Sequence, residues 1–331
     1  MAPAPPLLAQ EVELLVGAGR AADAWRLLNS RGQERDAEAL FILASWRLSG
    51  AIVRRDLGAA RALFGHAAEA GHLEAARAYI AFTGNGTGGP ADWPLALRLL
   101  GQLGAADPEA RAELELVQAM PLSAAGEPQA LPAAERLSER PDVTCIRGFL
   151  SAAECDFLIQ VAEPWLTPSL VVDPHNGQLV QNPVRTSDAM VFPWIAESPA
   201  VHAFNRRIAA ATGTAPAQGE PLQILRYRGG QQYRPHLDSV AGDANQRILT
   251  ALVYLNDDYA GGETQFVRTG LSFRGGKGDA LIFANALPDG RGDPEALHAG
   301  LPVRSGEKYL ASRWIRARPF SFPPPAPLLN L

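Results

Sequence analysis

The chain has 331 residues and a net charge of −5 at neutral pH. Its length is enough for about two domains, and an apolar fraction of 47% is ordinary for globular proteins. It has no long basic tract, which argues against a nucleic-acid partner. It also has no apolar run long enough to span a membrane, and its start does not resemble a signal peptide. We therefore expect a cytoplasmic protein of two domains.

The chain contains two cysteines, Cys145 and Cys155. Two thiols are too few for a disulfide framework. We expect them to be buried or idle thiols in a reducing compartment, in agreement with a cytoplasmic location.

The sequence from Gln10 to about Val117 is rich in alanine and leucine and has a helical pattern. A shift of 36 residues superimposes four identical pairs: Ala39 and Ala75, Gly50 and Gly86, Asp56 and Asp92, Ala60 and Ala96. A period of this size is typical of helix-pair arrays. The stretch from Asp56 to His72 resembles Sel1-like repeats, which are relatives of the tetratricopeptide family. Two roles stay open, a protein-binding groove or a short solenoid that only supports the second domain.

Prolines and glycines are dense from Met120 to Pro141, which predicts a linker with at most one short helix. The predicted organisation is a helical repeat domain at 1–120, a linker at 121–141, a second domain at 142–319 and a proline-rich tail at 320–331. We expect the tail to lie extended along the surface.

The second domain begins with few helices and continues with short apolar runs. Ser151 and Glu154 form a capping box, which predicts a helix over 152–162, and a second helix is expected at 199–211. Strands are predicted at 170–172, 222–227, 248–255, 263–267, 271–273, 280–283 and 309–316. Short strands separated by glycine and proline predict a β-sandwich or barrel. The segment from His175 to Pro183 is either a cover for the active site or a hairpin loop.

His236 and Asp238 are two residues apart, so in a strand they would face the same side. His298 follows 62 residues later, far enough for several antiparallel strands to bring it back. Two imidazoles and one carboxylate are the protein ligands of non-haem Fe(II) oxygenases. A lone His-x-Asp pair is more often structural, but here Lys308 follows His298 by ten residues in an ordered series of motifs. We therefore predict that His236, Asp238 and His298 bind a metal. The other histidines, His66, His72, His175 and His202, are expected to be repeat or surface residues.

The region from Val143 to Arg316 resembles the prolyl 4-hydroxylase branch of the Fe(II)/2-oxoglutarate dioxygenases. The resemblance is carried by Tyr227, Gly230, His236, Asp238, residues 245–256, residues 261–264, Gly278, Asp279, His298, Pro302, Val303, Gly306, Lys308 and residues 314–316. It implies a helical solenoid followed by a double-stranded β-helix, or jelly roll, with flanking helices and a metal in its mouth.

The resemblance also implies the cofactors Fe(II), 2-oxoglutarate and O₂, with ascorbate as a candidate reductant. Lys308 would bind the distal carboxylate of 2-oxoglutarate. Tyr227 and Thr264 would donate hydroxyl hydrogen bonds to the same molecule, and Trp314 would pack beside it. The reaction would convert 2-oxoglutarate to succinate and CO₂ and hydroxylate a C–H bond.

For the substrate, the resemblance implies a groove lined by Glu220, Tyr233, Arg247 and Arg316. Each charged member has an equally strong interpretation as a structural or surface charge. The family position favours a peptidyl proline. Arg316 stands where many relatives have His or Lys, which leaves the exact substrate open.

The sequence leaves three functions open. The first is a hydroxylase of prolyl residues in a peptide or protein, with the helical repeats helping to bind a protein. The second is the same chemistry on a free amino acid, another residue type or a small metabolite. The third is a non-catalytic adaptor or sensor, in which the repeats bind a partner and the jelly roll is a sensor or scaffold.

Overall fold

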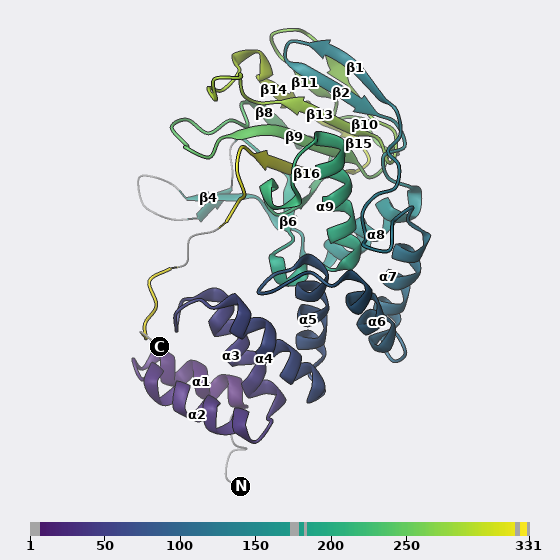
Figure 1. Cartoon of the computed structure of the whole chain (residues 1–331). Coiled ribbons are helices and arrows are strands. Elements are labelled where there is room, and N and C mark those ends of the chain that lie inside the picture. The colour runs from purple at the N-terminus through teal and green to yellow at the C-terminus, as the bar shows by residue number, and fades with distance from the viewer. Residues whose placement is uncertain (1–6, 173–178, 182–183, 322–324, 330–331) are drawn as a thin grey trace.

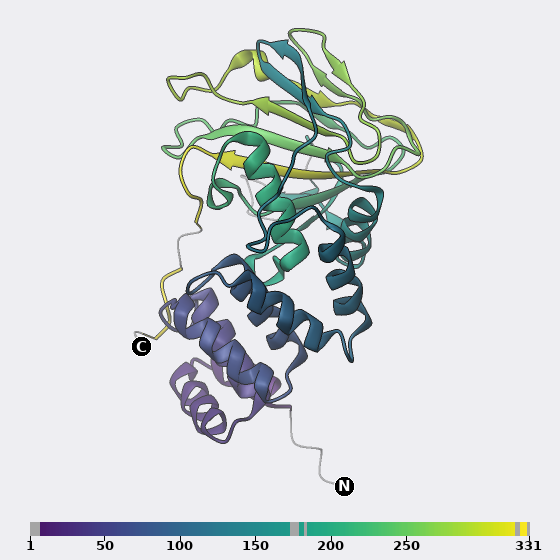
Figure 2. The same ribbon diagram turned by 45° about the vertical axis from the view of Figure 1, so that its right-hand side comes forward.

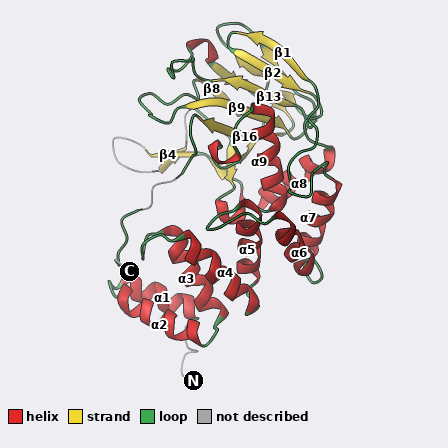
Figure 3. Cartoon of the chain, viewed as in Figure 1, coloured by secondary structure: helices red, strands yellow, loops and turns green. Residues whose placement is uncertain are grey.

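The computed structural model describes every residue except 1–6, 173–178, 182–183, 322–324 and 330–331. Helices form the N-terminal part of the chain and strands form most of the C-terminal part (Figures 1 and 3). The α-helices are α1 (Leu8–Gly17), α2 (Ala21–Gln33), α3 (Ala37–Ser49), α4 (Leu57–Glu69), α5 (Leu73–Asn85), α6 (Trp93–Leu103), α7 (Pro108–Ala119), α8 (Ala152–Ala162) and α9 (Pro199–Thr212).

The strands form two main antiparallel sheets that face each other as in a jelly roll. The larger has the order β1-β2-β13-β9-β16-β7-β6-β3, and the smaller has the order β12-β11-β14-β8. Their bounds are β1 (Ala134–Glu139), β2 (Asp142–Ile146), β3 (Thr167–Pro168), β6 (Asp188–Val191), β7 (Gln223–Tyr227), β8 (Tyr233–His236), β9 (Arg247–Tyr254), β11 (Thr264–Phe266), β12 (Ser272–Phe273), β13 (Ala280–Ala284), β14 (His298–Gly300) and β16 (Lys308–Arg316). Two small pairs complete the domain, β4 (Leu170–Val172) with β5 (Leu179–Gln181), and β10 (Ala260–Gly261) with β15 (Val303–Ser305).

The 36-residue period is visible in how successive helix pairs begin and end. Asp56 caps α4 by accepting a hydrogen bond from Ala59, and Asp92 caps α6 in the same way through Leu95. Gly50 and Gly86 end α3 and α5 in the left-handed conformation, which a residue with a side chain adopts only at a cost. The predicted array of helix pairs is therefore confirmed, while its assignment to the Sel1-like repeats stays a prediction.

The helical part and the β-domain are joined by a common apolar core. Trp93 of α6 and Val117 of α7 are buried in the same cluster as Leu158 of α8 and Phe204 of α9. Figures 1 and 2 both show α9 between the larger sheet and the N-terminal helices. Burial of large apolar side chains against one another favours one fixed arrangement of the two parts.

Two details of this region differ from the sequence-based expectations. β1 lies inside the stretch predicted as a linker and pairs with β2 at the edge of the larger sheet. Its side chains are mostly exposed, so it lacks the apolar alternation that marks a half-buried strand. His202, expected at the surface, is only 6% exposed because α9 is covered on several sides. Its Nδ1 lies 2.6 Å from Glu197 Oε1, and its Nε2 accepts a hydrogen bond from Arg206.

Several other predictions can be compared directly with the structure. The predicted helices at 152–162 and 199–211 are α8 and α9, and both cysteines are buried and free. The side chain of His175 and most of the segment to Pro183 lie outside the described residues. Within the described part of the chain, no helix has the length and apolar character needed to cross a bilayer.

A buried ion pair fixes α8 to α9 and gives a test of the fold. Arg207 NH2 lies 2.7 Å from Glu154 Oε1, and both side chains are about 5% exposed. We expect Glu154→Ala to lower the free energy of unfolding by about 3–5 kcal/mol, because it leaves a buried guanidinium without its counter-charge. Urea denaturation followed by circular dichroism measures this loss. Asp156→Ala, which removes an exposed partner of Lys277, is the matched control and should cost less than about 1 kcal/mol.

Candidate metal centre and cosubstrate site

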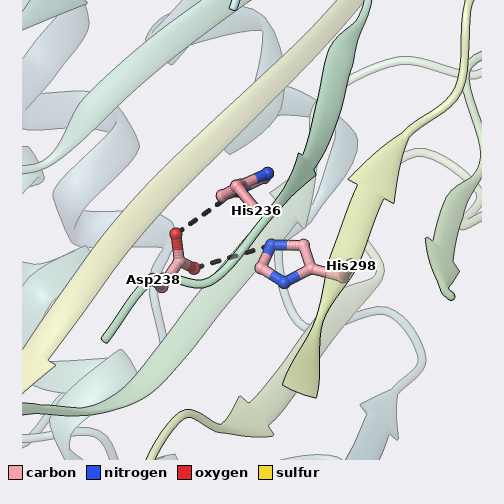
Figure 4. Close-up of side chains that lie close together, drawn as sticks. All are labelled: His236, Asp238 and His298. Atoms are coloured by element: carbon pink, nitrogen blue, oxygen red, sulfur yellow. Dashed lines mark ion pairs between the residues drawn. The ribbon is translucent and has the colours of Figure 1, made fainter. Parts of the chain in front are cut away.

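Three donors from two segments of the chain meet at one end of the smaller sheet. His236 is the last residue of β8, His298 is the first residue of β14, and the two are paired across the sheet. Asp238 lies just beyond β8, so the predicted i, i+2 strand geometry is wrong in detail. The turn nevertheless brings its carboxylate between the imidazoles, as Figure 4 shows.

The distances between these donors suit one shared ion. Asp238 Oδ1 lies 3.4 Å from His236 Nε2, and Asp238 Oδ2 lies 3.6 Å from His298 Nε2. One ligand atom from each residue can be chosen so that all three lie within 4.8 Å of one another. An ion about 2 Å from each of its ligands spans ligand separations of up to about 4 Å, which the separations of Asp238 from the two imidazoles meet. Two imidazoles and a carboxylate on one side are the set used by non-haem Fe(II) sites.

The second nitrogen of each imidazole has a backbone partner, which leaves Nε2 free to face the carboxylate of Asp238. His236 Nδ1 lies 2.8 Å from the carbonyl oxygen of Arg234, and His298 Nδ1 lies 2.9 Å from that of Ala296. A carbonyl can only accept, so each Nδ1 carries the proton and each Nε2 presents a lone pair. Burial also keeps the pKa of His298 below its ordinary value, which favours the neutral form that binds metals.

Asp238 is held by a short relay of side chains that the sequence did not reveal. Thr250 Oγ1 donates to Asp238 Oδ2 at 2.6 Å, and Asn285 Nδ2 donates to Thr250 Oγ1 at 2.8 Å. All three side chains are buried. Burial would raise the pKa of Asp238, but the nearby His298 and His236 and the hydrogen bond from Thr250 hold it well below its usual range. The carboxylate is therefore ionised and fixed in orientation.

Replacement of Thr250 by valine tests this relay, because valine keeps the shape and removes the donor. We expect a 10- to 100-fold loss of metal affinity, roughly the effect of removing an outer hydrogen-bond partner from a metal ligand. Competition with a metal-sensitive dye measures the affinity without any need for turnover. Thr250→Ser restores the hydroxyl and should restore most of the affinity. Equal affinity in the valine variant would show that Asp238 does not need the relay.

Lys308 extends from β16 into the same cavity that the three donors line. It is 2% exposed, and its Nζ donates to the carbonyl oxygen of Gly262 at 2.8 Å. The rings of Tyr227 and Tyr254 lie 5.7 and 5.1 Å from Nζ. Within the described part of the chain, no carboxylate lies within ion-pair distance of Nζ. The cavity thus offers a buried cation to an anionic ligand.

The two glycines of the predicted motif at 261–264 are required by close backbone approach beside this lysine. A Cβ on Gly261 would lie 2.4 Å from the carbonyl oxygen of Pro302, and Gly261 has a φ of 75°. A Cβ on Gly262 would lie 3.2 Å from Lys308 Cδ. Only glycine combines this conformation with this space. The Gly-Gly pair therefore shapes the wall against which Lys308 lies.

The other predicted cosubstrate residues also line this cavity, namely Tyr227, Thr264 and Trp314. Tyr227 is paired with Lys308 across β7 and β16. Its burial raises the pKa of the phenol, so it stays protonated and can donate. Thr264 Oγ1 lies 2.8 Å from the hydroxyl of Tyr254, a residue that was not predicted. The structure thus brings these residues together, while their contacts with 2-oxoglutarate stay a prediction.

The four predicted substrate residues are placed in two different surroundings. Tyr233 lines the cavity, and its ring stacks on His236 with the ring centroids 3.4 Å apart. Glu220, Arg247 and Arg316 do not line it. Glu220 Oε1 lies 2.6 Å from the Nε atoms of both arginines. Such a network favours the structural interpretation for Glu220 and Arg316.

Arg247 differs from the other two because it also touches a cavity residue. Its guanidinium lies 3.6 Å from the centroid of the Trp314 ring. Trp314 in turn lines the cavity. Arg247 therefore packs against Trp314, a residue of the cavity wall, and its charge is compensated by Glu220.

Several cavity residues were missed by sequence reasoning. Leu310 and Ser312 lie on β16 between Lys308 and Trp314, and all four line the cavity. The alternation of side chains along a strand from Lys308 was a signal that could have identified both. Arg185 also lines the cavity, and its guanidinium lies 5.8 Å from the Tyr233 ring centroid.

The buried ammonium makes anion binding dependent on pH. Burial lowers the pKa of Lys308 to about 7, and the charge of Glu263 offsets this only in part. Above pH 7 the cation needed by a carboxylate is progressively lost. We expect the apparent affinity for 2-oxoglutarate to fall about tenfold for each pH unit well above 7, with uptake of one proton on binding. Calorimetry of metal-loaded protein in buffers of different ionisation enthalpy measures both effects, and a pH-independent affinity between 7 and 9 would contradict them.

Comparison with known proteins agrees with this geometry. Residues 222–316 match the family described as the 2OG-Fe(II) oxygenase superfamily. Prolyl 4-hydroxylase 1 of Arabidopsis thaliana is 37% identical over 203 residues, which cover 56% of this chain and 72% of that protein. Prolyl 4-hydroxylase 5 of the same plant is 35% identical over 210 residues, with the same coverage of both chains.

Among solved structures, a viral collagen prolyl hydroxylase from Paramecium Bursaria Chlorella virus-1, in complex with 2OG, is 31% identical. It aligns with a TM-score of 0.43 over 53% of this chain and 96% of its own. The motifs, the ligand geometry and the sequence identity to the plant proteins lead to one conclusion. The chain belongs to the prolyl 4-hydroxylase-like branch of the 2OG-Fe(II) oxygenase superfamily, the dioxygenases that use Fe(II), 2-oxoglutarate and O₂.

Proposed function

We propose that this protein hydroxylates a prolyl residue in a peptide or protein. In the balanced reaction, 2-oxoglutarate, O₂ and a C–H bond give succinate, CO₂ and a C–OH group. The observation that carries the proposal is the shared cavity, in which the three donors and the ammonium of Lys308 face one space. The names of the plant relatives support proline as the target residue.

We propose that some residues of this chain bind the metal and that others bind and orient the cosubstrate. Fe(II), when bound with 2-oxoglutarate and O₂, supplies the oxidising power for the C–H bond. We propose that His236, Asp238 and His298 hold the metal on one side and leave its other positions to the cosubstrate and O₂. Three protein ligands are the number that leaves room for a bidentate oxo acid and O₂ on one six-coordinate ion.

Lys308 is proposed to bind the distal carboxylate of 2-oxoglutarate. A charge-assisted hydrogen bond in a buried site contributes about 1.5–3 kcal/mol. The hydroxyls of Tyr227 and Thr264 are proposed to donate to the same end of the molecule. Trp314, held from behind by Arg247, would limit how far the cosubstrate can move. Ascorbate remains a candidate reductant.

Tyr233 is the predicted substrate residue with the strongest support from position. It lies over His236 at the cavity and offers an aromatic face to a neighbouring group. Arg247 borders the same wall through Trp314. We propose that Tyr233 contacts the target residue, and that Glu220 and Arg316 act by fixing the position of Arg247.

The test is turnover by the purified full-length chain. With Fe(II), 2-oxoglutarate and a proline-rich peptide, we expect one succinate for each peptide that gains the mass of one oxygen atom. Tandem mass spectrometry should place that oxygen on proline. Conversion of a free amino acid or metabolite, with peptides left unchanged, would replace the peptide proposal by the small-molecule alternative.

A binding measurement is enough to distinguish the adaptor alternative from an enzyme. A protein that acts only as a scaffold need not bind Fe(II) and 2-oxoglutarate together, so an anaerobic titration showing neither would revive it. For the helical part, we propose a role in binding a protein substrate or partner. Comparison of peptide and whole-protein substrates with a variant altered on the exposed helix surfaces tests that role.

A further inference from the structure

The C-terminal segment does not simply lie along the surface as expected but returns to the helical part. Leu328 N donates to the carbonyl oxygen of Ala51 at 3.0 Å, and Leu329 N donates to that of Ile52 at 2.7 Å. Leu329 also forms a parallel β-bridge with Val53. Figures 1 and 2 both place the C-terminal end of the chain beside the first helices. The connection between α3 and α4 thus accepts an added strand.

The side chains of this segment alternate as in a strand on an apolar surface. Leu329 packs against the cluster that includes Val53, Leu43 and Trp46, all of which are buried. Leu328 points away and is 64% exposed. Addition of an extended peptide to exposed backbone, with alternate side chains entering a pocket, is a known way for proteins to bind peptides. One leucine side chain is the specific contact here.

The other end of the tail is fixed to the β-domain, in part through the loop that leads into β9. Arg318 N donates to Asn245 Oδ1 at 2.8 Å, and Phe320 N donates to the carbonyl oxygen of Ala217 at 2.8 Å. Asn245 belongs to the loop that begins at Asp238 and leads into β9. The tail therefore connects the loop that carries a proposed metal ligand to the helical part, at a point distant from the core shared by α6, α7 and α9.

We propose that the α3–α4 connection at residues 51–53 is a docking site for an extended leucine-containing segment preceded by proline. The chain's own C-terminus occupies it reversibly. Two backbone hydrogen bonds and one partly buried leucine are a small contact for an untethered peptide. Attachment at Phe320 supplies an effective concentration of roughly millimolar order, which keeps the site filled. Pro325 and Pro327 restrict the chain to extended conformations and so reduce the entropy lost on docking.

The first test uses the full-length chain and a matched pair of variants. Leu329→Asp places a charge against the apolar cluster, whereas Leu328→Asp changes a side chain in solvent. Hydrogen exchange is read at the amides of residues 328 and 329 and corrected for the intrinsic rates of each sequence. We expect exchange in Leu329→Asp to be at least roughly tenfold faster than in the parent chain, with Leu328→Asp close to the parent. Equal behaviour of the two variants would overturn the proposal.

The second test asks whether the site binds the segment when it is supplied separately. An isotope-labelled peptide with the sequence of residues 325–331 is added to a chain that ends at residue 324. We expect its leucine signals to broaden with the shortened chain, and to broaden much less with the full-length chain, whose own tail competes. The same peptide carrying L329D should not broaden. Absence of broadening with the shortened chain, or equal broadening with both chains, would show that residues 51–53 are not a docking site.

Discussion

Replacement of Lys308 by methionine is expected to weaken 2-oxoglutarate binding by roughly one to two orders of magnitude while making the protein more stable. The side chain is 2% exposed, and burial lowers its pKa to about 7. Because the folded pKa lies below the unfolded value, the unfolded chain binds more protons between about pH 7 and 10. In that window stability rises with pH, and below it the buried charge opposes folding in full.

The size of the stabilisation follows from the same pKa. Each pH unit by which a pKa is displaced corresponds to about 1.4 kcal/mol. Loss of the hydrogen bond to Gly262 offsets part of the gain, so we expect the free energy of unfolding to rise by about 2 kcal/mol at pH 6. Methionine has a similar length, but it cannot replace the donor to the carbonyl oxygen of Gly262.

Two measurements and one control decide this prediction. Thermal or urea unfolding without ligands gives the stability, and calorimetry with metal-loaded protein gives the affinity for 2-oxoglutarate. Lys277, the chain's only other lysine, forms a partly exposed pair with Asp156 and supplies the control variant Lys277→Met. That control should leave the affinity unchanged. A Lys308→Met protein that still binds 2-oxoglutarate normally would remove Lys308 from the site.

Replacement of His298 by alanine is the second change with a large expected effect. It removes one of three donors from a buried site and leaves His236 and Asp238 alone with the ion. Loss of a hydrogen-bond partner of a metal ligand lowers the metal affinity by up to about a hundredfold. Loss of the ligand itself should therefore lower the metal affinity by more than about a hundredfold. Turnover of 2-oxoglutarate should fall to background.

Metal binding, measured by dye competition, distinguishes this outcome from a simple loss of activity. His66→Ala is a suitable control, because His66 is exposed on α4 far from the donors in sequence and in the fold. It should bind metal and turn over like the parent chain. Normal turnover in His298→Ala would rule out the proposed ligand set.

Much of the catalytic half could be predicted because the spacing of its residues along a strand determines which side chains share a face. Lys308 and Trp314 lie an even number of residues apart on one strand, so they share a face of β16. The spacing of His236 and Asp238 predicted two metal donors, and the structure brings them together although Asp238 lies past the end of β8. In the helical part, the pairing of Asp56 with Asp92 in the 36-residue period has a local cause, because both side chains accept from the first free amides of a helix.

The features that could not be predicted depend on contacts between residues far apart in the sequence, which produce no periodic sequence pattern. Thr250 of β9 meets Asn285, which directly follows β13, and no local pattern indicates that they support Asp238. Glu220 joins Arg247 and Arg316 only after three segments have folded together.

The contact of Leu329 with the α3–α4 connection likewise joins segments that are far apart in the sequence. A proline-rich tail gives no sign of where its last residues will bind. Such contacts are set by the tertiary fold, which is why the supporting residues and the docking site came only from the structure.

A crystal structure with Mn(II) and 2-oxoglutarate is the most direct test of the central claim, that three donors and one ammonium form a single site. We expect one metal ion bound by Nε2 of His236, Nε2 of His298 and the carboxylate of Asp238, with the distal carboxylate of 2-oxoglutarate on Lys308 Nζ. A metal bound elsewhere, or a distal carboxylate paired with another cation, would contradict it.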